Sequence, residues 1–298
     1  MMTRRTGNAG IKRLFSNRTD RVSRSRSGDF LMFLFIGTAA VFCALPLVMS
    51  IGMSLKPIHE LYVFPPTLWP RSLTGDNYKM LFTLLSTGQV AFSRYAFNTV
   101  FIKVVTTACH VVFASMAAYP LAKGDFPGKK LLHQMVLLAL MFVPAIADVI
   151  NYQTIVSLGW LDTYMAAIAP NVATTLGLFL ITNYMVTIPD TLLEAARIDG
   201  AGTFRILWSV VMPLIRPAWL TLALLSFQGQ WSAVAGGTIL SEQLKTLPYC
   251  VAQIAGAGIA RSGNMAAMSV IMMLPPILLY WFSQCSIMET MSNAGIKE

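Results

Sequence analysis

The stretch that decides the fold is IPDTLLEAARIDGAGT, residues 188–203, which connects two long apolar runs. It predicts a short helix over residues 190–200. Asp190 follows Pro189 and can accept hydrogen bonds from the first free backbone N–H groups of that helix. Gly200 supplies the left-handed conformation that ends many helices. We therefore expect a helix of about two and a half turns, at 3.6 residues per turn, between two membrane spans.

One face of this helix carries two small residues at its centre. Spacings of three and four bring four residues onto that face: Leu192, Ala195, Ala196 and Asp199. Glu194 and Arg197 are three apart, so they can pair with each other or with groups of a partner protein. Thr203 can cap a second helix that runs through Trp208 to Pro213. The pattern predicts a helix-turn-helix with a face suited to close contact.

Apolar runs on both sides of this connection indicate a membrane protein. Of the 298 residues, 55% are hydrophobic and 12% charged, whereas a soluble domain carries about a quarter charged residues. A span needs roughly 20 apolar residues. Six runs meet that requirement: 31–53, 97–121, 132–150, 166–188, 214–235 and 265–285. The sequence predicts an all-α integral membrane protein with six transmembrane helices and both termini on one side.

The basic residues indicate which side faces the cytoplasm. Arginines and lysines crowd residues 1–29, which have little apolar content, so we expect a basic cytoplasmic tail there and a transmembrane domain over 30–298. The predicted inner loops also contain basic residues, namely Lys123, Lys129, Lys130, Arg197 and Arg205. The net charge of +9 does not indicate nucleic acid, because no aromatic residues are interleaved with the N-terminal arginines.

The connection also resembles a known motif. Glu194-Ala195-Ala196, then Gly200 and Val210-Val211-Met212-Pro213, is similar to the EAA motif of ABC importer permeases of the binding-protein-dependent type. The string EAARIDGA resembles the carbohydrate branch and the smaller permease subunit of maltose-type sugar transporters. Further fragments match in order and spacing: Asn77-Tyr78, residues 118–123, residues 126–129, residues 159–164, residues 246–248 and residues 294–297. The chain departs from the family at Trp231-Ser232-Ala233, where an Asn and an acidic residue commonly follow the Trp.

The resemblance implies a type I ABC importer permease in a bacterial plasma membrane. In that family the helix around residues 190–200 docks on the ATPase subunit, so it implies ATPase coupling by Glu194, Ala195, Ala196, Arg197, Asp199 and Gly200. It also implies four kinds of partner: a second homologous permease, two ATPase subunits, an extracytoplasmic solute-binding protein and membrane lipid. ATP and Mg would bind to the ATPase subunits, and this chain would hold no cofactor. The implied solute is a sugar or oligosaccharide, with a polyamine or a phosphate ester as the alternative.

No catalytic or metal site is predicted. The loop Gly124–Lys130 has three residues between its glycines and no hydroxyl after the lysine, so it does not fit a phosphate-binding loop. Cys43, Cys109, Cys250 and Cys285 show no metal-ligand spacing. The isolated His110 is interpreted as a packing residue. An ion-gradient carrier is disfavoured because no span contains a carboxylate relay.

Polar residues within spans are candidates for the translocation pathway, because such groups are costly in lipid. Asn183, Gln228 and Gln230, with the neighbouring Trp231, are the pathway candidates, and hydrogen bonding between helices is the alternative. Lys103, Asp148 and Asn151 lie near the predicted outer ends of spans. We expect those three to snorkel or to cap helices. The long loop Lys56–Ala96 is expected to fold over the helix ends or to contact ligand.

Overall fold

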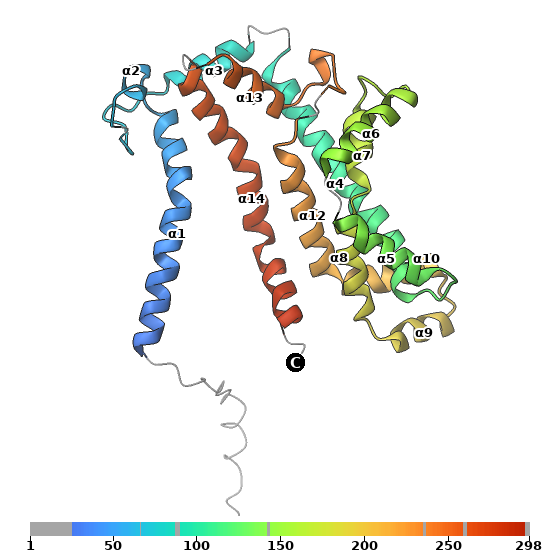
Figure 1. Ribbon diagram of the computed structural model, residues 1–298. Coiled ribbons are helices and arrows are strands. Elements are labelled where there is room, and N and C mark those ends of the chain that lie inside the picture. Colours follow the sequence, from blue (N-terminus) through green and yellow to red (C-terminus); the bar gives the residue numbers. More distant parts are fainter. Residues whose placement is uncertain are drawn as a thin grey trace, which may run out of the picture. The chain divides into compact units, whose positions relative to one another are not determined.

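The computed structural model describes residues 26–65, 67–86, 90–141, 144–234, 237–258 and 261–295. Every regular element in this described part is a helix, which confirms the all-α class (Figure 1). The elements are α1 (Arg26–Ser54), α2 (Ile58–Leu61), α3 (Asp76–Ser86), α4 (Phe92–Lys123), α5 (Lys129–Leu140), α6 (Pro144–Ser157), α7 (Tyr164–Val172), α8 (Thr175–Val186), α9 (Asp190–Ile198), α10 (Thr203–Ile206), the π-helix η1 (Leu207–Val211), α11 (Met212–Leu214), α12 (Arg216–Trp231), the 3-10 helix η2 (Glu242–Leu244), α13 (Leu247–Gly256) and α14 (Ser262–Gly295).

The chain divides into two compact units, residues 1–49 and 50–298. The described part of the first unit is residues 26–49 of α1. The whole helix has 29 residues and extends about 44 Å at 1.5 Å per residue. That length exceeds the ~30 Å hydrocarbon layer. Its large apolar side chains are exposed, for example Phe33 and Phe35, as expected of a helix that meets lipid or another membrane chain. Residues 1–25 of the predicted basic tail lie outside the described residues.

Three of the predicted spans are single helices long and apolar enough to cross a membrane. They are residues 28–54 of α1, the whole of α4 and residues 262–284 of α14. These helices contain the predicted runs 31–53 and 97–121 and nearly all of 265–285. The membrane class read from the sequence is therefore supported by the lengths of these helices.

Two other predicted spans are bent rather than straight. The run 166–188 forms α7 and α8, which meet at 42°, and α12 joins the α10–α11 segment at 83°. Span 214–235 therefore starts later than predicted, at Arg216, and its helix ends at Trp231. Pro217 explains the sharp bend, because it lacks an N–H group and its ring obstructs a continuous helix. Each bent pair is long enough to count as one span.

The run 132–150 contains parts of two helices, and its assignment as one span stays a prediction. Helices α5, with 12 residues, and α6, with 14 residues, occupy this region. Residues 142–143 between them lie outside the described residues. Pro144 opens α6, where a missing N–H costs nothing. The described helices thus supply five spans if each bent pair is one, and the count of six remains a prediction.

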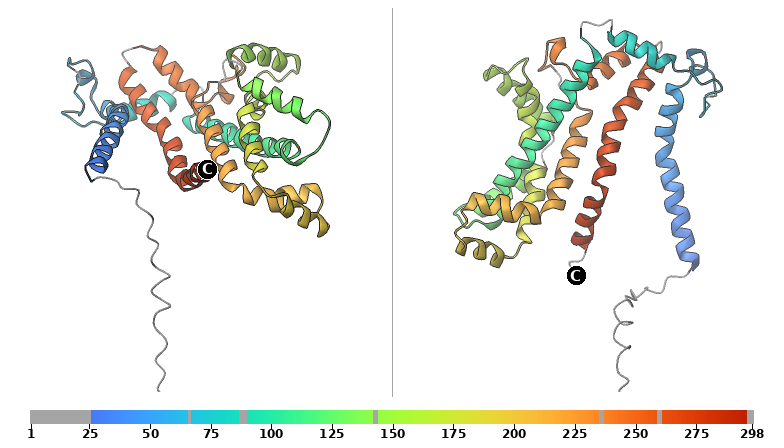
Figure 2. Two further views of the ribbon diagram at one scale, coloured as in Figure 1. Left: turned by 60° about the horizontal axis from the view of Figure 1, so that its bottom comes forward. Right: turned by 180° about the vertical axis from the view of Figure 1, so that it is seen from behind.

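In the second unit, α4 lies at the centre of the bundle. It packs against α7, α8 and α12, while α14 packs against α12, α3 and α13 (Figure 2). One core cluster lies toward α9 and includes Ile181, Met185, Ile206 and Leu222. A second joins α3, α4, α13 and α14 around residues such as Leu81. These two clusters hold the opposite ends of the bundle.

The loop Lys56–Ala96 folds over the helix ends through hydrogen bonds of its own. Lys56 is 3% exposed and its Nζ donates to the carbonyl of Thr67. The side-chain amide of Asn77 donates to the carbonyls of Ser54 and Lys56, at 2.8 and 2.7 Å. The carboxylate of Glu60 accepts from a backbone N–H within the same loop. These contacts agree with a structural connection, the first of the two interpretations.

Candidate functional site

Helix α9 begins directly after Pro189 and is fixed by a lysine from another helix. The sequence predicted that Asp190 caps α9, but Asp190 is the first residue of the helix and its carboxylate makes no cap. The carboxylate pairs instead with Lys123 of α4, with Nζ 2.8 Å from Oδ1. The same ammonium donates to the carbonyl of Ile188 at 2.5 Å. The Lys123 hydrogen bond holds the pKa of Asp190 below its ordinary value of 3.8. Sequence reasoning assigned Lys123 only a topological meaning.

The end of α9 is the turn that the sequence predicted. Gly200 has φ +80°, and its N–H donates to the carbonyl of Arg197 at 3.0 Å. The N–H of Ala201 donates to the carbonyl of Ala196, also at 3.0 Å. This pair of bonds is the Schellman motif, which stops a helix where a residue adopts the left-handed conformation. The prediction that Thr203 caps the next helix was wrong. Gly202 precedes α10, and there is no side-chain cap at that position.

Helix α9 is anchored by residues that differ from those on the predicted face. Leu193 is 2% exposed and belongs to the core cluster with Ile206 and Val211. Ala196 is half-buried and packs against the same cluster. Leu192, Ala195 and Asp199 remain exposed. The spacing of three between Leu193 and Ala196 is the signal in the sequence that could have identified the inward face.

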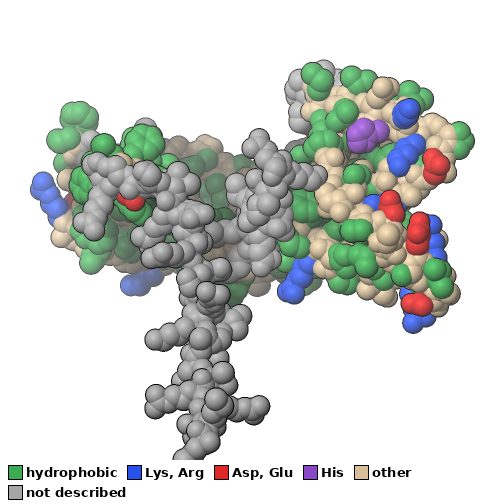
Figure 3. All heavy atoms as spheres, turned by 90° about the horizontal axis from the view of Figure 1, so that it is seen from below, with side chains coloured by type: hydrophobic (Ala, Val, Ile, Leu, Met, Phe, Trp, Pro, Cys, Tyr) green, Lys and Arg blue, Asp and Glu red, His purple; other side chains and the backbone are tan. Residues whose placement is uncertain are grey.

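The outward surface of α9 and α10 combines charge with exposed apolar side chains. Ile198 is 86% exposed and Phe204 63%. Glu194, Arg197 and Asp199 are also exposed, and within the described part of the chain Glu194 and Arg197 form no ion pair with each other. Figure 3 shows acidic and basic side chains interspersed with apolar ones at this end of the molecule. A surface of this composition is suited to contact with another protein.

The predicted pathway residues differ in exposure. Asn183 on α8 and Gln228 on α12 are exposed, whereas Gln230 and Trp231 are buried. Trp231 donates from Nε1 to the carbonyl of Met272 at 2.7 Å and stacks on Phe227. The indole is thus occupied in joining α12 to α14. None of these four residues lines the cavity described next.

A different polar set does come together. Lys103, Asp148 and Asn151 line one cavity of about 860 Å³. Lys103 is only 6% exposed, so the expectation that it snorkels to water is wrong. Asp148 and Asn151 belong to α6 and do not cap a helix terminus. The sequence could not reveal this grouping, because it depends on how α4 and α6 are placed in the fold.

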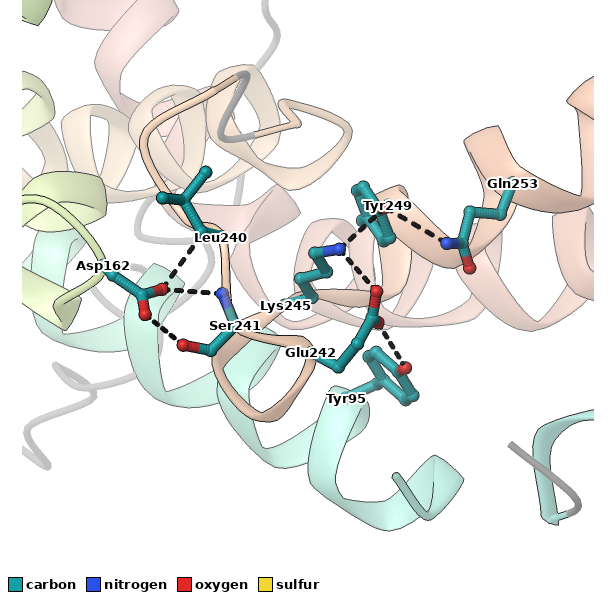
Figure 4. Close-up of polar contacts among 8 residues, drawn as sticks. All are labelled: Tyr95, Asp162, Leu240, Ser241, Glu242, Lys245, Tyr249 and Gln253. Carbon is teal, nitrogen blue, oxygen red and sulfur yellow. Dashed lines mark hydrogen bonds and ion pairs between the residues drawn. The ribbon is translucent and has the colours of Figure 1, made fainter. Parts of the chain in front are cut away.

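At the end of the bundle opposite α9, Asp162 clips two loops together (Figure 4). Its carboxylate accepts hydrogen bonds from the N–H groups of Leu240 and Ser241, at 2.9 and 2.8 Å, and from the Ser241 hydroxyl. Asp162 itself has φ +57°, and its N–H donates to the carbonyl of Thr238 at 2.9 Å. The Ser241 bonds hold the pKa of Asp162 below its ordinary value of 3.8.

The loop that Asp162 clips is also attached to α4. Lys245 pairs with Glu242 at 2.5 Å and donates to the Tyr249 hydroxyl at 2.8 Å (Figure 4). The side-chain amide of Asn98 donates to the carbonyls of Gln243 and Lys245, at 2.8 and 2.9 Å. Two of the short fragments quoted from the sequence, residues 159–164 and 246–248, thus flank one cross-linked assembly of loops. It makes this end of the bundle rigid.

Comparisons with known proteins agree with this architecture. Residues 110–285 match the model of the family described as binding-protein-dependent transport system inner membrane component. The arabinooligosaccharides transport system permease protein AraQ of Halalkalibacterium halodurans is 29% identical over 89% of this chain and 94% of its own length. The trehalose/maltose transport system permease protein MalG of Thermococcus litoralis is 30% identical over 89% and 96%.

A solved structure shares the fold. A bacterial ABC transporter involved in the import of the acidic polysaccharide alginate contains a chain that superposes with a TM-score of 0.74 at 22% identity, covering 89% of this chain and 99% of that one. Its match extends well beyond the α9 region. The family match covers more than half of the sequence and includes α9 and its flanking helices. This chain therefore belongs to the family of binding-protein-dependent transport system inner membrane components, the multi-pass permeases of such importers.

Proposed function

We propose that this chain is the permease subunit of an ATP-driven importer that carries a sugar or oligosaccharide across the bacterial plasma membrane. The observation that carries the proposal is α9, a short helix that is anchored by Leu193, stopped at Gly200, and exposed on its outer surface. The sequence of this helix matches the coupling motif of the family. The names of the permeases AraQ and MalG support carbohydrate as the solute class.

The outer surface of α9 would dock on an ATPase subunit. Glu194, Ala195, Arg197 and Asp199 supply polar contacts and room for close approach, and Ile198 adds an apolar side chain. Ala196 and Gly200 would act by setting the position of the helix. ATP and Mg would bind to two ATPase subunits. Closure of those subunits would move α9, and Lys123 would carry that movement to α4 through Asp190.

Three further parts of the proposal concern partners and orientation. A family defined as binding-protein-dependent supports an extracytoplasmic solute-binding protein as one partner. The exposed apolar surface of α1 and the exposed polar groups of Asn183 and Gln228 support a second permease as another. The basic residues near α9 favour a cytoplasmic location for this end of the bundle, with both termini on that side.

Purification of the tagged chain from native membranes tests the proposal directly. We expect an ATPase and a second permease to co-purify, and reconstituted vesicles to take up sugar only when ATP and the binding protein are present. Recovery of the chain alone, together with uptake driven by a proton or sodium gradient, would contradict the proposal. Uptake of a polyamine or a phosphate ester instead of sugar would keep the importer and change its solute.

A further inference from the structure

The cavity of about 860 Å³ lies among α4, α6 and α7, toward the end of the bundle opposite α9 (Figure 1). Its volume is within the ~300–1,000 Å³ range typical of small-molecule sites. Its charged and polar lining includes Lys103 of α4 and Asp148, Asn151 and Tyr152 of α6. None of these residues has a role in the α9 surface or in the clip at Asp162.

Lys103 is the unusual member of the lining. It is 6% exposed, and its Nζ lies 3.4 Å from the carbonyl oxygen of Ala233. An ammonium group carries three hydrogen-bond donors, and across the described ranges no carboxylate forms an ion pair with this one. A buried cation is costly unless it meets an anion. The cavity therefore presents a positive charge that no described carboxylate contacts directly.

The α6 side of the cavity has the opposite character. Asp148, Asn151 and Tyr152 are separated by three and four positions, so they share one face of α6. A carboxylate, an amide and a phenol together offer the acceptors and donors that bind hydroxyl groups. The Asp148 carboxylate would repel a ligand that is negatively charged throughout. The arrangement fits a ligand with one anionic group at the α4 side and hydroxyls at the α6 side.

We propose that this cavity binds an acidic sugar, with the ammonium of Lys103 receiving its carboxylate or phosphate group. This site rests on the proposed importer function and narrows its solute class. A neutral sugar would leave the Lys103 charge without a partner, so the cavity discriminates in favour of acidic sugars. Asp148 and Asn151 orient the sugar ring by its hydroxyl groups.

The test measures sugar binding to the membrane complex that co-purifies with this chain, washed free of soluble binding protein. The probes are galacturonate, galactose 6-phosphate and the neutral galactobiose, compared by equilibrium dialysis. We expect at least one acidic probe to bind about tenfold or more tightly than galactobiose. Lys103→Gln should weaken the binding of that acidic probe by about 10–100-fold, the loss expected for a charge-assisted hydrogen bond. Lys103→Arg keeps the charge, so its affinity for the acidic probe should stay within a few-fold of the wild type.

Two controls separate binding from folding. Lys79→Gln changes an exposed lysine on α3 that lies outside the cavity, and it should leave all affinities unchanged. Asn151→Cys, placed in a background without other cysteines, should react with a maleimide and be protected by the acidic probe. Each variant is first shown to be monodisperse with the same co-purifying partners. Lys103→Met provides a second charge-removing variant if the glutamine disturbs packing.

The outcomes divide clearly. The proposed site is contradicted if neither acidic probe binds. It is also contradicted if Lys103→Gln weakens the binding of galactobiose as much as that of the acidic probe. ATP-driven uptake of a neutral sugar that Lys103→Gln leaves unchanged would also overturn the site while the importer function stands. Loss of acidic-sugar binding in Lys103→Gln, in a complex without ATP-driven uptake, would retain the site and overturn the importer function. Preference for galacturonate or for galactose 6-phosphate identifies the anionic group.

Discussion

The imidazole of His110 lies directly against Gly177, and this contact sets how closely α4 and α8 approach. A Cβ atom at position 177 would lie 2.1 Å from His110 Nε2. The ring is held on both sides, since Nδ1 is 2.7 Å from the Ser226 hydroxyl and Nε2 is 2.8 Å from the Thr174 hydroxyl. Helices α4, α8 and α12 therefore meet at one side chain, which confirms the interpretation of His110 as a packing residue.

Gly177→Ala should destabilise the protein, because the added methyl group forces His110 to move and breaks at least one of its two hydrogen bonds. The expected cost is about 1–3 kcal/mol, the range for overpacking of a filled core. Thermal unfolding of the detergent-solubilised protein measures it. Gly229→Ala in α12 is the matched control, because a Cβ there meets nothing within 4 Å. An equal loss of stability in both variants would contradict the role given to His110.

Gly200→Val should abolish transport while membrane insertion persists. Position 200 has φ +80°, which a β-branched residue adopts only with strain of about 1–2 kcal/mol. The Schellman turn would open and α9 would lose its fixed end. Vesicle uptake and membrane yield measure the two effects separately.

Gly202→Val is the control for this change. Its backbone lies in the extended region, at φ −67°, and no atom lies within 4 Å of a Cβ there. We expect its transport to remain near the wild-type level. If transport fell as much as in Gly200→Val, the defect would come from bulk near the turn and not from backbone conformation.

The sequence predicted the elements that follow from local chemistry. The apolar lengths of α1, α4 and α14 and the glycine stop of α9 need only helix geometry and the conformational freedom of Gly200. The resemblance around Glu194 identified the family before any contact was known. These features are encoded within about twenty consecutive residues, which is why a single sequence was sufficient.

What the sequence could not provide depends on contacts between distant segments. Lys123 reaches Asp190 across 67 positions, and Lys103 of α4 shares its cavity with residues of α6. The pathway candidates were chosen for polarity alone, and polarity did not predict that Trp231 would bond to the carbonyl of Met272. The buried face of α9 likewise depends on its contacts with the core cluster that contains Leu193.

Two substitutions on α9 should separate folding from docking. Leu193→Ala removes a side chain that is 2% exposed, and it should cost about 2–5 kcal/mol of stability. Ile198→Ala changes a side chain that is 86% exposed, so stability should stay within about 0.5 kcal/mol of the wild type. The same Ile198 variant should retain less ATPase subunit during purification. Full retention by Ile198→Ala would remove this residue from the docking surface.

Asp162 should make stability depend on acid. Because hydrogen bonds from Ser241 lower the pKa of Asp162 in the folded state below 3.8, the unfolded chain binds a proton more readily than the folded one. The contribution of this carboxylate is therefore complete above pH 3.8 and disappears as the pH falls from there through the lower folded-state pKa. The difference in Tm between the wild type and Asp162→Asn should be constant between about pH 5 and 7 and should shrink below about pH 3.8. Asp125→Asn, an exposed carboxylate without such a clip, should match the wild type throughout, and a gap for Asp162→Asn that widens with acid would show that the clip does not depend on the charged form.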